Sequence, residues 1–296
     1  MSEVAWIAVD WGTSHLRAWL MRGDGAVLDR RSSVQGMGAL DRDGFEPALR
    51  ALVGDVLPAP VLACGMVGSR QGWAEAPYAA VPCAPPSAAE AAQVPGTDLD
   101  VRILPGVKQA RPADVMRGEE TQIAGFLATS PGFDGVICLP GTHTKWAHVS
   151  AGEIVSFRTA MTGEMFALLS QRSVLRHSVG EGWDADGFAA SVDQSLSRPE
   201  GLAAALFSLR AEGLLEGLDG ASARARLSGL LVGAELAAMR PYWLGQQVAL
   251  IGAEALSNAY AEALGGQGVP IQMASAEEMT LAGLTAAYTQ IYGEAA

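Results

Sequence analysis

An acidic residue, Asp10, ends an apolar segment of the chain, and Gly12, Thr13 and Ser14 follow shortly after it. A glycine at a bend lets backbone N–H groups approach an anion closely, and the two hydroxyl groups add donors. A carboxylate cannot bind a phosphate directly, but it can hold Mg²⁺ through water, and the metal then neutralises phosphate charge. Arg17 lies within reach of the same region. The first bend of the chain is therefore a candidate site for magnesium and phosphate, with Asp10 as the metal-side acid.

A partial copy of this pattern occurs later in the chain, where Gly141–Thr142 aligns with Gly12–Thr13. The copy includes the strand before the bend, the strand after it, a glycine turn and a third strand. The second copy has no acidic residue at the position that corresponds to Asp10. Either bend alone is typical of an ordinary tight hairpin, but their repetition indicates two related domains and favours a clamp for a polyphosphate. The second bend offers these candidate ligands: Gly141, Thr142, His143, Thr144 and Lys145.

The elements that must position these bends are short strands followed by helices in both halves, which favours α/β domains. A length of 296 residues fits two domains, and we expect them to be 1–131 and 132–296, with the hinge near Pro131–Gly132. Apolar periodicity and turn residues predict strands at Val4–Val9, His15–Met21, Ala26–Arg31, Val61–Cys64, Val136–Leu139, Lys145–Val149, Ile154–Arg158, Gln247–Ile251 and Ile271–Met273. They predict helices at Phe45–Val56, Asp114–Thr129, Glu164–Leu175, Pro199–Glu212, Ala221–Met239, Ala255–Leu264 and Ala276–Tyr292. Residues 74–105 are expected to form loops and short strands.

Composition narrows the function classes. The net charge of −12 disfavours a nucleic-acid binder, which usually carries a basic face. No apolar run approaches the ~20 residues of a membrane span, and the acidic N-terminus does not resemble a signal peptide. The three cysteines are widely spaced and form no metal-binding motif, so we expect reduced thiols, no structural zinc and a cytoplasmic location. Homo-oligomerisation is compatible with the sequence but cannot be read from it.

Two such hairpins, followed by a strand–Gly–Ala–helix segment near the C-terminus, resemble the actin-like ATPase superfamily, which includes hexokinase and glycerol kinase. Over essentially the whole chain, the sequence most resembles the 2-dehydro-3-deoxygalactonokinase family. The segments that carry this resemblance are VDWGTSHLRAW, ACGMVGSRQGW, MRGEETQ, LPGTHTKWA, TGEMFALLSQRSVL and IGAEALSNAY.

The resemblance implies an α/β fold of two related actin-like ATPase (ribonuclease H-like) domains with an interdomain cleft. It also implies that the closing helix packs on the first domain. The implied activity is ATP-dependent phosphorylation of the terminal 6-hydroxyl of 2-dehydro-3-deoxy-D-galactonate, in galactonate catabolism, with ATP and Mg²⁺ as cofactors. The product would be 2-dehydro-3-deoxy-6-phospho-D-galactonate.

Sugar kinases of this superfamily take their general base from an acid at the start of the helix that precedes the second domain. The matching segment here is RGEETQ, and Glu120 corresponds best to the base, with Glu119 as its main competitor. A plainer alternative is that both glutamates are surface groups that complement the helix dipole.

A carboxylate substrate is matched by the fork of an arginine, which can hold it through two hydrogen bonds. The glycine-rich segment GMVGSRQGW follows a predicted strand and is assigned to the substrate, with Arg70 as the leading carboxylate ligand and Arg117 and Arg158 as rivals. Arg70 as a solvated loop charge, and Trp73 as a core residue, remain open alternatives. The substrate-binding candidates are Gly65, Ser69, Arg70, Gln71, Trp73 and Arg117.

The segment IGAEAL resembles the adenosine-binding segment of the superfamily, in which glycine leaves room for adenine. Gly252 and Ala253 are the expected contacts, and His143 lies in the second phosphate bend as a candidate hydrogen-bond donor. Two alternative functions occur within the superfamily: an exopolyphosphatase-type hydrolase, and a non-enzymatic nucleotide switch like the chaperone and actin branches. The first would require a basic channel and the second large insertions, and neither is visible in the sequence.

Overall fold

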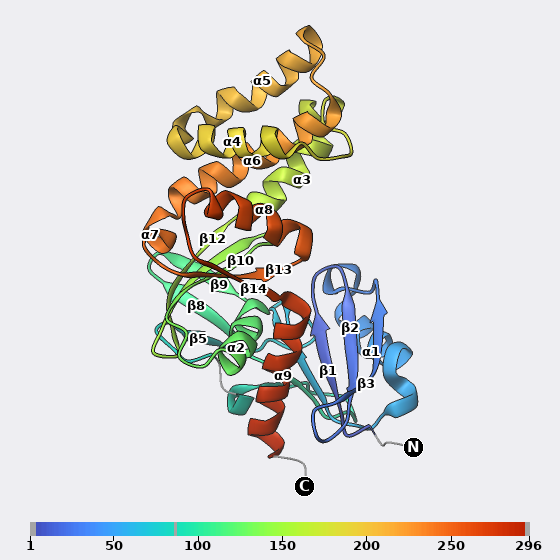
Figure 1. Cartoon of the computed structure of the whole chain (residues 1–296). Coiled ribbons are helices and arrows are strands. Elements are labelled where there is room, and N and C mark those ends of the chain that lie inside the picture. Colours follow the sequence, from blue (N-terminus) through green and yellow to red (C-terminus); the bar gives the residue numbers. More distant parts are fainter. Residues whose placement is uncertain (1–3, 86–87, 294–296) are drawn as a thin grey trace. The chain divides into compact units, whose positions relative to one another are not determined.

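The computed structural model describes residues 4–85 and 88–293 (Figure 1). The chain divides into two compact units built from discontinuous segments. The first comprises Met1–Asp134, Val149–Ser156 and Ser275–Ala296, and the second comprises Gly135–His148 and Phe157–Ala274. Compactness alone does not define an independently folding domain. The domain division expected at residue 131 therefore stays a prediction.

The main sheet of the first unit has the strand order β3-β2-β1-β4-β7-β6. Its strands are β1 (Trp6–Trp11), β2 (Leu16–Met21), β3 (Val27–Ser33), β4 (Val61–Cys64), β6 (Ala92–Gln93) and β7 (Val101–Ile103). β1 pairs antiparallel with β2 and parallel with β4. Asp10 thereby lies between Arg17 on one neighbouring strand and Cys64 on the other.

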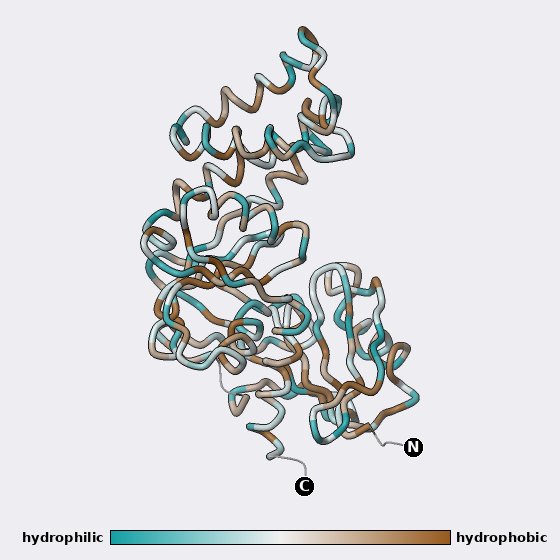
Figure 2. Tube along the Cα trace, viewed as in Figure 1, coloured by the Kyte–Doolittle hydropathy of each residue, from teal (hydrophilic) through white to brown (hydrophobic). Residues whose placement is uncertain are grey.

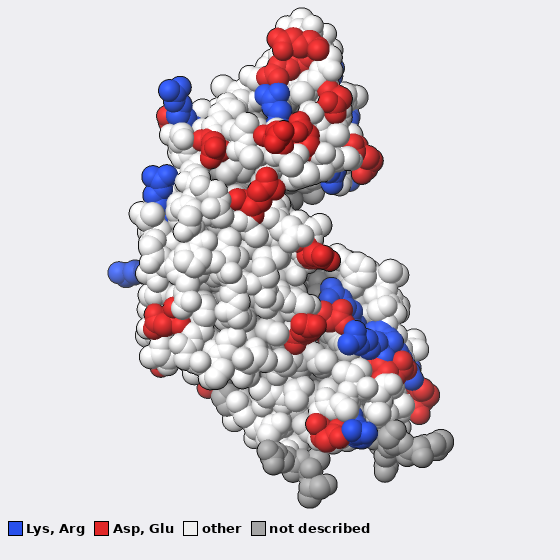
Figure 3. Space-filling model, viewed as in Figure 1, with Lys and Arg blue, Asp and Glu red and all other residues white. Residues whose placement is uncertain are grey.

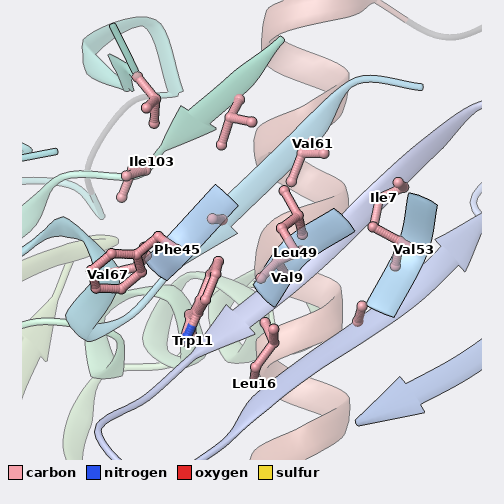
Figure 4. Packing of buried hydrophobic residues seen from close by; sticks show 14 of the residues in the cluster. Ile7, Val9, Trp11, Leu16, Phe45, Leu49, Val53, Val61, Val67 and Ile103 are labelled. Carbon is pink, nitrogen blue, oxygen red and sulfur yellow. The ribbon is translucent and has the colours of Figure 1, made fainter. Parts of the chain in front are cut away.

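Both faces of β1 are buried because its side chains alternate between two covering helices. Ile7, Val9 and Trp11 face α1 (Phe45–Val53), whose apolar residues recur with helical spacing (Figure 4). The alternate residues of β1 pack instead in a cluster with α9 (Ala276–Tyr292). A strand covered on both faces must be apolar along most of its length, which explains why Asp10 stands out in the sequence.

A second, three-stranded sheet in this unit has the order β5-β8-β9, with β5 (Tyr78–Ala80), β8 (Gly106–Ala110) and β9 (Ala113–Met116). The sequence predicted a helix from Asp114, and this was wrong for its first part. Residues 113–116 pair antiparallel with β8, and the helix α2 starts only at Glu119 and ends at Thr129. Gly118 precedes it with a φ of 110°, a conformation that interrupts any helix.

The helices α2 and α9 pack closely because small residues face each other. A β-carbon on Gly125 would overlap the carbonyl oxygen of Met279, and one on Gly283 would overlap that of Thr121. This contact holds the C-terminal helix against the element that carries Glu119 and Glu120. The position of α2 in the first unit is therefore set in part by residues more than a hundred positions away in the chain.

The sheet of the second unit has the order β12-β11-β10-β13-β14. Its strands are β10 (Gly135–Leu139), β11 (Thr144–Ser150), β12 (Glu153–Ala160), β13 (Val248–Gly252) and β14 (Ile271–Ser275). β10 and β13 are parallel neighbours, so the bends that follow them leave the same edge of the sheet. The turn end of the β11–β12 hairpin, residues 149–156, groups with the first unit, where Ile154 bridges Cys83.

Helices make up the rest of the second unit: α3 (Thr162–Arg172), α4 (Ala185–Ser197), α5 (Leu202–Leu215), α6 (Gly220–Ala238), α7 (Arg240–Trp243) and α8 (Glu254–Gly265). The sequence did not predict α4. It packs on α6 where Gly229 and Gly233 leave room for its backbone. Figure 2 shows hydrophobic stretches, in brown, running through the sheets of both units. None of the helices within the described residues is long and apolar enough to cross a membrane.

Most other predicted elements are present, with ends shifted by a few residues. The helix predicted at Phe45–Val56 ends as α1 at Val53 and continues as a 3₁₀ turn, Gly54–Val56. The segment 74–105 contains β5, a 3₁₀ turn at Ala88–Glu90, β6 and β7; positions 86 and 87 lie outside the described residues. The three-strand pattern of the first bend, β1-β2-β3, recurs as β10-β11-β12, as the internal repeat predicted.

Candidate active site

Asp10 lies near the end of β1 and forms an ion pair with Arg17, with 3.5 Å between Oδ2 and Nη1. Its side chain is 21% exposed. Burial raises the pKa of Asp10, and the nearby Arg17 opposes that rise. An additional positive charge beside this carboxylate, such as a divalent cation, would therefore stabilise the ionised form.

The short 3₁₀ turn Met37–Ala39 supports the first bend through backbone hydrogen bonds. The N–H of Met37 donates to the carbonyl of Gly12 at 2.9 Å, and the N–H of Gly38 donates to that of Thr13 at 2.9 Å. The side chains of Thr13 and Ser14 are exposed, so their hydroxyls are accessible to a ligand. A β-carbon on Gly36 would overlap the backbone of Ser14. This supporting turn was not predicted from the sequence. The feature that could have indicated it is the closely spaced glycine pair in VQGMGAL.

Two glycines that are far apart in the sequence, Gly65 and Gly118, lie next to each other near Asp10. A β-carbon on Gly65, which follows β4, would lie 2.8 Å from the carbonyl oxygen of Trp11 and 3.4 Å from Oδ1 of Asp10. A β-carbon on Gly118 would lie 3.3 Å from the Cα of Gly65. Both glycines have positive φ values, of 94° and 110°. The start of α2 is therefore brought to the end of β1 within one unit.

Glu120 lies at the start of α2 and is 2% exposed. The N–H of Gly118 donates to both of its carboxylate oxygens, at 2.8 and 2.7 Å, and the hydroxyl of Thr121 donates at 3.3 Å. Burial, reinforced by the charge of Glu119, raises the pKa of Glu120 to about 7, although the bond from Gly118 opposes the rise. A carboxyl group with this pKa can accept a proton near neutral pH.

Glu119 is less buried than Glu120 and has a different partner. Its Oε2 accepts the N–H of Arg117 at 3.1 Å. The alternative that both glutamates are surface groups does not hold for Glu120, because its side chain is in the interior.

The segment after Gly65 places its polar residues in different environments. Ser69 is buried, and its hydroxyl has no hydrogen-bond partner among the described residues. Arg70 is 82% exposed and pairs with Glu75 at 3.7 Å, and Gln71 is exposed. Trp73 stacks on Phe45 with their ring centroids 6.3 Å apart. Trp73 therefore packs against the core of the first unit while staying partly exposed, and its contact with the sugar acid stays a prediction.

Arg117 is buried and joins three parts of the first unit. Its guanidinium lies over the ring of Tyr78 at 4.2 Å, and Nη2 donates to the carbonyl of Ala76 at 2.8 Å. Its Nη1 is buried and finds no hydrogen-bond partner in residues 4–85 and 88–293, and it lies close to where a β-carbon on Gly68 would stand. The contacts with Tyr78 and Ala76 hold Arg117, and therefore the backbone directly before Gly118, in place. Arg158, the other rival, lies on β12, and its side chain is exposed.

The second bend, in the second unit, holds its residues at different depths. Thr142 and His143 are exposed, and Gly141 is partly buried. Thr144 and Lys145 are buried, with Thr144 Oγ1 3.1 Å from the hydroxyl of Tyr260 and Lys145 Nζ donating to Thr159 at 3.0 Å. The bend thus presents backbone and two exposed side chains, while its last two side chains point into the protein.

The start of α3 lies directly against the second bend. The N–H of Glu164 donates to the carbonyl of Thr142 at 2.9 Å, and the Glu164 carboxylate is 2.6 Å from Nε2 of His143. A β-carbon on Gly163 would overlap the carbonyl oxygen of Gly141. The TGE segment is therefore conformationally tied to the bend, which sequence spacing alone did not indicate.

Gly252 and Ala253 follow β13 and lie beside the start of the second bend. A β-carbon on Gly252 would lie 3.3 Å from the carbonyl oxygen of Pro140 and 2.7 Å from Oγ of Ser257. The Ser257 hydroxyl is buried and has no hydrogen-bond partner within the part of the chain that the structure describes. The parallel pairing of β10 and β13 thus brings together the two segments expected to bind phosphate and adenosine.

Charged side chains do not form a basic channel on the face drawn in Figure 3. Over β2 and β3, basic groups alternate with acidic ones, and Arg30 pairs with Glu277 at 3.0 Å. Within residues 4–85 and 88–293, no three His, Cys, Asp or Glu side chains form a group that could hold a metal by themselves. A metal at Asp10 would need ligands from a substrate or water, as Mg²⁺ commonly has.

A mixed α/β fold with two related strand–bend–strand hairpins, an acid at the first bend and a buried acid at a helix start defines a kinase of the actin-like ATPase fold. The chain belongs to the 2-keto-3-deoxy-galactonokinase family, whose profile matches residues 10–287. The family and the fold class that the sequence predicted are thus confirmed, and neither the hydrolase nor the nucleotide-switch alternative is favoured.

Relatives of nearly equal length support this assignment. A probable 2-dehydro-3-deoxygalactonokinase from Rhizobium meliloti (strain 1021) is 41% identical over 299 residues, covering 96% of this chain and 97% of the relative. The 2-dehydro-3-deoxygalactonokinase of Escherichia coli (strain K12) is 35% identical over 293 residues, covering 94% and 96%. The crystal structure of a Sinorhizobium meliloti protein, provisionally named a 2-dehydro-3-deoxygalactonokinase, has a TM-score of 0.91 and 39% identity, covering 97% of this chain and 99% of that one.

Proposed function

We propose that this protein transfers the γ-phosphoryl group of ATP to the 6-hydroxyl of 2-dehydro-3-deoxy-D-galactonate in galactonate catabolism. The names of the relatives support the substrate. The observation that carries the proposal is the buried Glu120, with a pKa of about 7, held at the start of α2 in the same unit as Asp10. An acid in this state suits proton removal from an alcohol.

In the proposed reaction, the 6-hydroxyl oxygen forms a bond to the γ-phosphorus while the bond to the β–γ bridging oxygen breaks. The hydroxyl proton passes to the Glu120 carboxylate, and ADP leaves with the electron pair of the broken bond. The hydrogen bonds from Gly118 hold the carboxylate in one orientation before the proton arrives. Phosphoryl transfer depends mainly on such positioning and on charge neutralisation.

Asp10 is the proposed magnesium ligand. Mg²⁺ in kinases is usually held by one or two carboxylates together with phosphate oxygens and water, so a single acid at this place fits the ion. When bound, the ion would neutralise phosphate charge. The raised pKa of Asp10 supports this role, because a nearby cation would offset the cost of burying the ionised carboxylate.

The proposed phosphate ligands are residues of both bends. Backbone N–H groups and exposed hydroxyls are the groups best suited to bind phosphate oxygens. In the first bend these residues are Gly12, Thr13, Ser14 and Arg17. In the second they are Gly141, Thr142 and His143, together with Thr144 and Lys145, which would contribute their backbone N–H groups because their side chains are buried. Gly252 and Ala253 are proposed to contact adenosine. The sugar acid is assigned to Gly65, Ser69, Arg70, Gln71 and Trp73, with Arg117 as a further candidate.

The proposal is tested by ADP release measured against a panel of sugar acids. Turnover should require 2-dehydro-3-deoxy-D-galactonate and yield its 6-phosphate, identified by mass spectrometry. The gluconate-derived epimer, which differs at one hydroxyl, serves as the matched competitor. ADP release that is independent of every sugar acid would support the hydrolase instead and overturn the proposal.

We also propose a cytoplasmic location, which the free thiols of Cys64, Cys83 and Cys138 support. Oligomerisation stays a prediction that light scattering of the purified protein would check.

A further inference from the structure

A carboxylate that the proposed reaction does not use lies inside the second unit. Glu235, on α6, is 5% exposed. Its Oε1 accepts the indole N–H of Trp146 at 2.7 Å, and its Oε2 accepts the hydroxyl of Tyr260 at 2.8 Å. Oε2 also accepts the hydroxyl of Thr162. The three donors come from β11, α8 and α3, so a single carboxylate joins three elements.

These three donors are neutral, which makes the buried group costly to retain. Burial raises the pKa of Glu235, and the bonds from Thr162, Trp146 and Tyr260 oppose that rise. Replacing a buried, hydrogen-bonded charge by apolar packing is often neutral or favourable for stability. Stability alone therefore gives little reason for an acid at this place, and a role in positioning its donors is the better explanation.

The single proton of the Tyr260 hydroxyl determines which group donates in each of its two hydrogen bonds. The Tyr260 hydroxyl has one proton, which it donates to Glu235. In its second contact, at 3.1 Å, Tyr260 must therefore accept, and the donor is the hydroxyl of Thr144. The donation runs from Thr144 through Tyr260 to Glu235. It turns the Thr144 hydroxyl inward and leaves the backbone of the second bend for a ligand.

The same carboxylate also reaches the other side of the bend. Thr162 is the first residue of α3, and the next residues of that helix contact Gly141 and Thr142. Glu235 thus holds the bend at its end, through Tyr260 and Thr144, and at its flank, through Thr162. Both connections lie wholly within the second unit.

We propose that Glu235 is a positioning residue for nucleotide binding, which holds the second bend in its phosphate-binding conformation through the Tyr260–Thr144 and Thr162 hydrogen bonds. This inference rests on the proposed function, in which that bend binds the phosphates of ATP. It predicts that breaking the hydrogen-bond chain weakens ATP binding while leaving the binding of the sugar acid unchanged.

The test uses Tyr260→Phe and Thr144→Val, each of which removes one hydroxyl of the chain and keeps most of the packing volume. Losing one hydrogen bond is worth about 1 kcal/mol, so the Kd of ATP, measured by calorimetry, should rise roughly five- to tenfold in each variant. The KM for the sugar acid should not change. The double variant should cost no more than either single one, because both break the same chain. Thr144→Ser, which keeps the hydroxyl, should restore ATP affinity.

Trp243→Phe is the matched control. It removes a buried bond from Trp243 Nε1 to the carbonyl of Leu236, at 2.8 Å, in the same core but outside the Thr144–Tyr260–Glu235 hydrogen-bond chain. It should lower the Tm without changing the Kd of ATP. The inference is overturned if Tyr260→Phe and Thr144→Val bind ATP as the wild type does, or if Trp243→Phe weakens binding equally.

The two proposals can fail separately. A wild-type protein that binds ATP but phosphorylates no sugar acid would overturn the proposed function and leave the test of Glu235 valid. A wild-type protein that does not bind ATP would overturn both. If Tyr260→Phe does not fold, Thr144→Val, which alters a smaller side chain, still decides the question.

Discussion

The backbone N–H of Gly118 lies 2.8 and 2.7 Å from the two carboxylate oxygens of Glu120, although only one residue separates them in the chain. Gly118 adopts a φ of 110°, which an L side chain rarely tolerates, and its missing β-carbon leaves room for Gly65. This glycine therefore both orients the proposed base and allows α2 to start beside the end of β4.

Replacing Glu120 by Gln should lower kcat by about 10²- to 10⁴-fold, because the proposed base is removed while its shape and burial are kept. The coupled ADP-release assay measures this loss, and the KM values should change little. Glu119→Gln is the matched control and should remain close to wild type. The opposite result, with Glu119→Gln inactive and Glu120→Gln active, would assign the base to Glu119.

The activity should depend on pH through Glu120. The proposed base acts when ionised, so kcat/KM should rise with pH to a plateau, with an apparent pKa of about 7. Because folding raises this pKa above its ordinary value of 4.5, the native state binds the proton more tightly than the unfolded state. The contribution of Glu120 to the free energy of unfolding should therefore fall as the pH rises from 4.5 to about 7.

Urea unfolding of wild type and Glu120→Gln across this pH range checks the stability half of that prediction. The variant should gain relative to the wild type as the pH rises. A rate profile that is flat across neutral pH would argue against an ionisable base at this position.

Replacing Asp10 by Asn should abolish the response of turnover to added Mg²⁺ and lower kcat by more than about a hundredfold, because charge neutralisation by a metal is worth several kcal/mol. Stability should be kept or increased, since burial already disfavours the charged form and raises the pKa of Asp10. Magnesium titration of activity, with the Tm as a check on folding, measures both effects. Asp24→Asn, at an exposed hairpin turn, is the control. An unchanged magnesium dependence in Asp10→Asn would remove Asp10 from the metal site.

Arg70→Ala should raise the KM for the sugar acid by about tenfold or more, the loss expected for a charged hydrogen bond, without changing the Tm. The reason for the unchanged Tm is that Arg70 is 82% exposed and its ion pair with Glu75 lies at the surface. Arg117→Ala should instead lower the Tm, because it removes the bond to Ala76 and the contact with the ring of Tyr78. If Arg70→Ala leaves the KM unchanged, the substrate carboxylate is bound elsewhere.

Gly163→Ala should destabilise the protein by about 1–3 kcal/mol, because its new β-carbon would overlap the carbonyl oxygen of Gly141 and displace α3 from the bend. Gly265→Ala, whose β-carbon would meet open space at the end of α8, should have little effect. Denaturant unfolding of the two variants checks the contrast. Equal stability would mean that the bend and α3 are not rigidly packed.

Several parts of the fold could not be predicted from the sequence because their cause is not local. The acidic stretch that begins at Asp114 has the composition of a helix start, and only its pairing with β8 makes its first residues a strand. The helix α4 contains glycine, serine and aspartate, which are poor helix formers, and it is stabilised by its close packing against α6.

The difference between local and non-local causes also explains which residues of the candidate site could be predicted from the sequence and which could not. The bends were predicted because glycine, hydroxyl and acidic residues next to one another in the chain remain next to one another in space. Glu235 gave no local signal, since Trp146, one of its partners, lies 89 residues away in the sequence. Its proposed role depends on three separate elements that donate to one carboxylate.

The sequence by itself determined the family, the α/β class, the repeated bends and the candidate residue types, because these depend on order and spacing along the chain. Only the tertiary structure decided which side chains are buried. It placed Glu120 in the interior and left Glu119 less buried, packed Trp73 against the core, exposed Arg70 and turned the Thr144 hydroxyl inward. Burial and hydrogen-bond partners are set by residues remote in the chain, and they control the pKa values and contacts on which the proposed chemistry depends.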